Sequence, residues 1–243
     1  MAGFITWDCF VLLIGSQGSD PSARAAPYPD QVEFRLVIVP GVTVDKWTRM
    51  WADRVPSVNL HVVPTAAADA AALLSTDADA GLLRLPVDRD TFHAVPLYTE
   101  TTVVVAPRGH LVSAADEVTM ADLADDTLLR PLDDVLPWPD APLGERPAGE
   151  RPADTAAAVA LVAAEAGVLV VPQSLARAHQ RRDVTHRVVT DAPTSSVGLV
   201  WPRERYTDLV EEMIGIVRGR TANSTRGRAP APAARTPKRR GRR

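Results

Sequence analysis

The sequence predicts an α/β fold in which parallel strands are flanked by helices. Apolar, β-branched runs alternate with helical patterns along most of the chain, which is typical of sheets covered by helices. Hydrophobic residues make up 46% of the 243 residues but aromatic residues only 5%, so Ala, Val and Leu must fill most of the core. Such a core suits parallel sheets packed against alanine-rich helices. The length is sufficient for one large domain or two small lobes.

The first half of the pattern is a strand–helix repeat. A β-branched run at 33–39 ends at Pro40-Gly41, which indicates a buried strand followed by a turn. Apolar residues at helical spacing follow Thr43, and Pro56 ends that helix. Two more strands are predicted at 59–63 and 80–83, with a helix at 66–74 between them.

The second half continues the pattern with a strong apolar strand at 101–106. Thr119 and Asp122 have the spacing of a reciprocal helix cap, which predicts a short helix at 119–124. Residues 133–152 are rich in proline and show no period, so we expect an irregular connection. The other expected elements are strands at 128–131, 168–171, 184–189 and 197–201 and helices at 155–166 (with Asp154 or Thr155 as N-cap), 173–180 and 207–217.

The two ends of the chain differ from its body. Residues 1–32 combine a short apolar run, interrupted by Asp8, with a stretch rich in Ser, Pro and Gly. The first basic residue is Arg24, so we expect a disordered or mis-called extension rather than a signal peptide. Residues 218–243 hold ten of the 27 Lys and Arg residues and no acid, which leaves 17 basic and 30 acidic residues elsewhere. This composition predicts a disordered tail.

Three segments resemble the effector-binding (substrate-binding) domain of LysR-type transcriptional regulators. The run L-L-R-L-P-V-D-R-D-T-F-H-A-V-P-L-Y-T-E-T-T-V-V-V-A-P-R-G-H-L-V at 82–112 is similar to the family's signature, although Leu111 follows His110 directly where the family has a Pro-x-x-His-Pro-Leu-like turn. V-T-M-A-D-L-A-D at 118–125 and the helix–Gly–strand–Pro–helix segment at 155–176 also match. The resemblance covers about residues 33–218.

The resemblance implies a two-lobed, type 2 periplasmic-binding-protein fold with mixed, mainly parallel sheets. Lobe I is expected at about 33–101 and 198–217, and lobe II at about 102–197. The family also pairs side by side, which implies a homodimer, and the apolar helix at 66–74 could serve that interface or the core. Only 32 residues precede the first strand, and they contain three prolines. We therefore expect no winged helix-turn-helix there and no sequence-specific reading of DNA.

The candidate ligand site follows from where such folds bind. Ligands lie at the carboxyl ends of strands and near helix N-termini, where free N–H groups favour anions. The expected ligand-binding residues are Gly41, Val42, Thr43, Arg84, Leu85, Thr101, Thr102 and Thr155. Arg84 could hold a carboxylate bidentately or be an ordinary surface arginine. The turn at Thr43 could equally be a plain helix cap, at most one of the two crossover threonines should face a ligand, and Asp154 beside Thr155 would repel an anion.

Nothing in the sequence indicates catalysis, a cofactor or a metal. The chain has one cysteine, Cys9, and five histidines without paired ligand spacing, and it lacks nucleophile-elbow and phosphate-loop patterns. We therefore expect a cytoplasmic, non-enzymatic module that binds a small, anionic effector and acts in regulation. One alternative is non-specific nucleic-acid binding through the tail residues Arg235, Lys238, Arg239, Arg240, Arg242 and Arg243. A second is an exported solute-binding protein, and a tail that only aids solubility also remains open.

Overall fold

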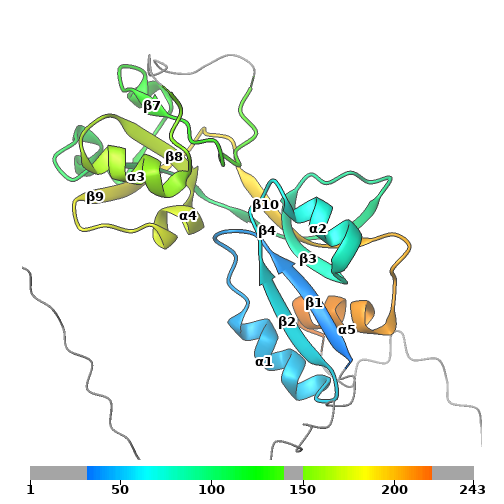
Figure 1. Ribbon diagram of the computed structural model, residues 1–243. Helices are drawn as coiled ribbons and strands as arrows, with labels where there is room; N and C mark the ends of the chain where they lie inside the picture. The colour runs from blue at the N-terminus through cyan, green and yellow to red at the C-terminus, as the bar shows by residue number, and fades with distance from the viewer. Residues whose placement is uncertain (1–31, 140–149, 221–243) are drawn as a thin grey trace, which may run out of the picture. The chain divides into compact units, whose positions relative to one another are not determined.

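The computed structural model describes residues 32–139 and 150–220 (Figure 1). The expected extension at 1–31 and the tail beyond Arg220 lie outside the described residues, as does part of the irregular connection. Within the described residues the chain forms two five-stranded sheets. No helix in that part of the chain is long and apolar enough to cross a membrane.

The first sheet, with its helices, is called lobe I below. Its strand order is β2-β1-β3-β10-β4. The strands are β1 (Glu33–Ile38), β2 (Asn59–Pro64), β3 (Ala80–Leu85), β4 (Phe92–Glu100) and β10 (Ser195–Pro202). Its helices are α1 (Asp45–Arg54), α2 (Ala70–Asp77) and α5 (Asp208–Val217). Figure 1 shows α1 and α5 beside each other, next to the sheet.

The second sheet is the basis of lobe II, and its strand order is β6-β9-β5-β8-β7. The strands are β5 (Thr102–Pro107), β6 (Glu117–Val118), β7 (Leu128–Leu129), β8 (Val168–Pro172) and β9 (Val184–Val189). Two α-helices, α3 (Thr155–Ala163) and α4 (Gln173–Ala178), pack on β5 and β8, and two short 3₁₀ helices lie at Leu111–Ala114 and Ala121–Leu123.

The arrangement of the apolar clusters explains why the sequences of the central strands are continuous apolar runs. In β5, Val103 and Val105 belong to one apolar cluster of lobe II, and Val104 and Ala106 to another. Successive side chains of a strand point to opposite faces, so both faces of this sheet are covered. Lobe I has a single large cluster, in which α2 buries Ala70 and Leu74. These two residues of the expected 66–74 helix therefore serve the core.

The expectation of mainly parallel sheets was wrong. Four strand pairs are parallel (β1–β2, β1–β3, β6–β9, β7–β8) and four are antiparallel (β3–β10, β4–β10, β5–β8, β5–β9). The physical reason is that the chain passes between the sheets twice, near Thr101 and near Pro193. Strands that begin after such a passage, β5 and β10, run against their neighbours. The strand β10 begins at Ser195, two residues before the start of the expected strand at 197–201.

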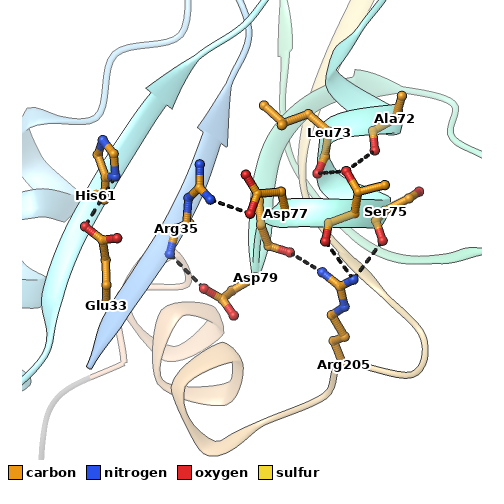
Figure 2. A network of polar contacts seen from close by, with 11 residues as sticks. Glu33, Arg35, His61, Ala72, Leu73, Ser75, Asp77, Asp79 and Arg205 are labelled. Atoms are coloured by element: carbon orange, nitrogen blue, oxygen red, sulfur yellow. Dashed lines mark hydrogen bonds and ion pairs between the residues drawn. The ribbon is translucent and has the colours of Figure 1, made fainter. Parts of the chain in front are cut away.

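Polar contacts connect α2 of lobe I to its neighbours at the surface (Figure 2). The guanidinium of Arg205 donates to the carbonyls of Ser75, Thr76 and Ala78 at 2.8–3.2 Å, which satisfies free carbonyls at the C-terminal end of α2. Arg35 of β1 pairs with Asp77 at 2.5 Å, and its N–H donates to Asp79. These contacts tie α2 to β1 and to the segment before α5, which is a structural role.

Candidate functional site

The turn after β1 has a conformation that requires glycine. Gly41 has a φ of +87°, a left-handed value that other residues adopt only with strain. A Cβ atom at Gly41 would lie 2.4 Å from the Oγ of Ser174, at the start of α4 in lobe II. The turn therefore brings the lobe I backbone directly against a hydroxyl of lobe II. The Ser174 Oγ is buried and has no hydrogen-bond partner among the described residues.

Arg84 has a different environment from the one expected. Its guanidinium pairs with Glu100 at the end of β4, and it also donates to the Ser195 Oγ at 2.8 Å. A further bond reaches the Pro40 carbonyl at 3.1 Å. The side chains of Arg84 and Glu100 are only 8% and 7% exposed. The name crossover cluster is used below for Arg84, Glu100, Ser195 and the Pro40 carbonyl.

Through these contacts Arg84 joins three segments: the turn after β1, through the Pro40 carbonyl, and the two passages between the sheets, through Glu100 and Ser195. The Arg84 charge is already compensated by Glu100, so an anionic ligand would share the guanidinium with that carboxylate. The Arg84 Nε, however, is buried and has no partner among the described residues. An unpaired buried donor is costly unless something else satisfies it.

Tyr98 is on the same strand as Glu100 and, by alternation, on the same face. Partial burial raises the pKa of the Tyr98 hydroxyl above its ordinary value, and the negative charge of Glu100 raises it further, against the opposing effect of Arg84. The hydroxyl is therefore protonated at neutral pH and can donate a hydrogen bond.

The two crossover threonines are in different surroundings, as alternation requires. The Thr102 side chain is buried and donates to the Pro193 carbonyl at 2.6 Å, which joins the two passages between the sheets. Thr101 is exposed, and its carbonyl accepts from the N–H of Gln173 at 2.9 Å, next to Ser174. Of the two, only Thr101 keeps its hydroxyl at the surface.

Three further residues of the expected ligand site are Val42 and Thr43, in the turn after β1, and Leu85, at the end of β3. Val42 is buried, Thr43 is exposed, and α1 begins after Val44 without a side-chain cap. The capping alternative for Thr43 therefore does not apply. Leu85 points away from Arg84, because neighbouring residues of β3 face opposite sides.

Thr155 is separated from this group by its own contacts. It is buried in lobe II, where its hydroxyl donates to Asp133 at 3.0 Å. Asp154 caps α3 by accepting from the N–H of Ala157 at 2.7 Å. The Asp154 carboxylate therefore occupies the N-terminus of α3, where an anionic ligand was expected from the sequence. The structure thus gathers Gly41, Arg84 and Thr101 around the turn and leaves Thr155 engaged elsewhere.

Sequence reasoning missed Glu100, Ser174 and Ser195. Glu100 belongs to the resembling motif at 82–112, which was the available signal for it. Nothing in the sequence marked the two serines. Within the described residues, no cluster of three or more His, Cys, Asp or Glu residues could hold a metal ion.

Residues 33–222 match the family model described as the LysR substrate binding domain. The chain belongs to this family. A LysR substrate-binding domain is a small-molecule effector-binding module, and the family is not one of enzymes. The expected family and its two-lobed, type 2 periplasmic-binding-protein-like α/β fold are therefore confirmed. No curated protein matches the chain by sequence.

Solved structures share the fold of this LysR substrate-binding domain. The effector-binding domain of a BenM variant is 16% identical with a TM-score of 0.63, over 77% of this chain and 93% of that one. The oxidised form of OxyR is 23% identical with a TM-score of 0.61, over 77% and 96%. A hydrogen-peroxide-bound OxyR mutant of Corynebacterium glutamicum is 20% identical with a TM-score of 0.61, over 79% and 68%.

Proposed function

We propose that this LysR substrate-binding domain binds a small anionic effector beside the turn of Gly41, Val42 and Thr43, in contact with Arg84, Ser174 and the Thr101 hydroxyl. The observation that carries the proposal is the pair of buried, unpartnered polar atoms that flank the turn, the Arg84 Nε and the Ser174 Oγ. Both can donate a hydrogen bond, so both would be satisfied by a carboxylate. The left-handed backbone at Gly41 lets the turn lie directly against Ser174, so a ligand bound to the Ser174 hydroxyl would also lie beside the turn.

The test is a ligand screen followed by variants at the turn. Thermal shift with small carboxylates and aromatic acids should find a ligand; benzoate belongs in the set because a related BenM domain has been solved "with its effector benzoate". Calorimetry then measures the affinity in Ser174→Ala and Gly41→Val. We expect Ser174→Ala to weaken binding several-fold without lowering the melting temperature, because the hydroxyl has no bond to lose in the free protein.

The control is Ser75→Ala, which removes an exposed hydroxyl of α2 and should leave affinity unchanged. Gly41→Val introduces a side chain where even a Cβ meets Ser174, so it should abolish binding. Equal affinity in wild type, Ser174→Ala and Gly41→Val would remove the turn from the effector site.

The module is proposed to act by binding alone, in the cytoplasm, with the effector influencing a regulatory partner. Support comes from the family and from the absence of catalytic patterns in the sequence. The single cysteine fits a reducing compartment. The alternative of an exported solute-binding protein is not favoured by the family match.

A second binding activity is proposed for the basic tail. Its charge is the supporting observation, because ten basic residues without an acid attract phosphates irrespective of sequence. The residues assigned to this contact are Arg235, Lys238, Arg239, Arg240, Arg242 and Arg243.

Assembly as a homodimer is also proposed, and α3 offers supporting evidence. Its outer side consists of apolar residues, Ala156, Ala160 and Leu161, of which Leu161 is 40% exposed. The partner that suits this surface is a second copy of the chain, because side-by-side pairing is what the family resemblance implies.

A further inference from the structure

A pocket of about 590 Å³ is lined mainly by lobe I, with Pro137 added from the segment between β7 and α3, and it lies over the opposite face of the lobe I sheet from the crossover cluster. Leu85 and Ser196 are paired across β3 and β10, and both line this pocket. Arg84 and Ser195 precede them in their strands, so their side chains point to the other side. The pocket is therefore separate from the site proposed for the effector. Its volume is in the range of small-molecule sites.

Much of the pocket is apolar. Leu85, Val87 and Ala94 contribute side chains from β3, the following loop and β4. Pro96 and Pro137 extend the apolar lining. Such a surface gains free energy by covering the hydrocarbon part of a ligand.

The charged side chains of the lining are both arginines. Arg89 and Arg203 lie together, because the Arg203 guanidinium donates to the Arg89 carbonyl at 2.8 Å and its backbone N–H donates to Thr91 at 3.0 Å. Neither arginine forms an ion pair with another described residue. Both arginines line one pocket and neither has an ion-paired carboxylate, so the pocket attracts an anion.

Two acidic residues, Asp88 and Asp90, flank Arg89 in the sequence, and neither lines the pocket. The Asp88 carboxylate accepts hydrogen bonds from the Thr91 hydroxyl at 2.5 Å and from the N–H of Asp90 at 2.9 Å. It is held in its own turn and does not line the pocket. Exposed His93 and the hydroxyls of Thr194 and Ser196 complete the polar lining, and they can hydrogen-bond to carboxylate oxygens.

We propose that this pocket is a second ligand site, which binds a small carboxylate with an apolar body. Arg89 and Arg203 would hold the carboxylate, for which the planar guanidinium is suited. The apolar part would lie against Leu85, Ala94 and Pro96. The site is independent of the turn at Gly41, so each can exist without the other.

The experiment monitors the pocket and the turn at Gly41 separately in one titration. The ¹⁵N-labelled full chain is titrated with 2-naphthoate, and in a second arm with octanoate, while amide shifts of Ala94 and Ser196 are compared with those of Gly41 and Ser174. We expect saturable shifts at Ala94 and Ser196, and the arm that saturates earlier tells whether the body is aromatic or aliphatic. The variant Arg89→Ala/Arg203→Ala should weaken this response at least about tenfold, as loss of charge-assisted hydrogen bonds requires.

Two further variants control the result. Arg181→Ala/Arg182→Ala removes two exposed arginines away from the pocket and should leave the response unchanged. Ala94→Glu adds a carboxylate at an exposed position of the lining, so it should repel the probe even if the double arginine variant unfolds. Absence of saturable shifts at Ala94 and Ser196 up to millimolar probe would overturn the proposal. An unchanged response in Ala94→Glu would do the same.

Discussion

At the scale of single residues, the Arg84–Glu100 pair has the largest expected effect. Both side chains are more than nine-tenths buried, and burial of two charges is compensated only while each has the other. Removing one partner leaves an uncompensated charge, which costs about 3–5 kcal/mol. Arg84→Ala should therefore lower the free energy of unfolding by about that amount, as measured by chemical denaturation.

A paired variant separates stability from binding. Arg84→Met with Glu100→Leu removes both charges and keeps the volume similar, so the protein should unfold near the wild-type denaturant midpoint. If Arg84 contacts the effector, this variant folds but no longer binds. Arg84→Ala with an unchanged midpoint would show that the pair is solvated rather than buried.

Contacts such as the Arg84–Glu100 pair could not be predicted from the sequence, although some of the strands that carry them could. A strand at 80–83, directly before Arg84, was predicted from a short apolar run, and the observed β3 extends to Leu85. The pairing of Arg84 with Glu100 was not predicted, because the two strands that carry them are joined only through β10, whose register sequence patterns do not reveal. The contact of Gly41 with Ser174 depends on how two separate sheets meet, so no local pattern contains it.

At the scale of elements, the segment from Thr119 to Leu123 has a testable dependence on pH. The Asp122 carboxylate accepts from the N–H and the hydroxyl of Thr119, both at 2.7 Å, and these bonds lower its pKa. The stabilisation is present at neutral pH and is lost as the pH falls through the lowered pKa. Asp122→Asn should therefore lose stability at neutral pH and show a shallower decline between neutral pH and about pH 3.

Urea midpoints measured across that range provide the check. Asp183, whose pKa is lowered by its contacts with Arg181, supplies a second acid-sensitive pair for comparison. Wild type and Asp122→Asn with parallel profiles would mean that the carboxylate does not contribute.

The sequence predicted the type of each element better than it predicted the residues at which the element begins and ends. The Thr119–Asp122 spacing identified the reciprocal cap, yet the segment forms a 3₁₀ turn of three residues instead of a helix over 119–124. Leu123 is buried there, and the chain must turn back into β7 within a few residues. In α3 the two candidate caps were Asp154 and Thr155; Asp154 is the cap, and the Thr155 hydroxyl donates to Asp133 instead.

At the scale of the whole molecule, the tail can be tested apart from the fold. A truncation after Arg220 removes eight of the ten basic residues and keeps the Arg220 carbonyl, which accepts from Arg54 at 2.8 Å. We expect the full chain to bind duplex DNA without sequence preference at low salt, and to lose affinity steeply between about 50 and 200 mM salt. The truncated chain should not bind, and its melting temperature should match that of the full chain.

Titration of both chains on two unrelated duplexes decides the matter. Binding that survives truncation, or that strongly prefers one duplex, would assign DNA contact to the folded part and contradict the expectation from sequence.

Self-association is the second property of the whole molecule. Sedimentation at micromolar concentration should show a dimer, and Leu161→Glu on α3 should shift it to monomer, because a charge on an apolar interface is costly to bury. Leu111→Glu is the matched control, since Leu111 is 89% exposed and outside α3. A monomeric wild-type chain would contradict the proposed assembly.

The strand order of lobe I has a consequence for synthesis on the ribosome. The strands of lobe II follow one another between Thr102 and Val189, so this half can fold as soon as it emerges. In lobe I, β10 lies between β3 and β4 and buries Val197, Leu199 and Val200 in the core, yet it is made after all of lobe II. Until then the nascent chain exposes unpaired edges on β3 and β4, and strand edges of this kind are where newly made chains associate wrongly.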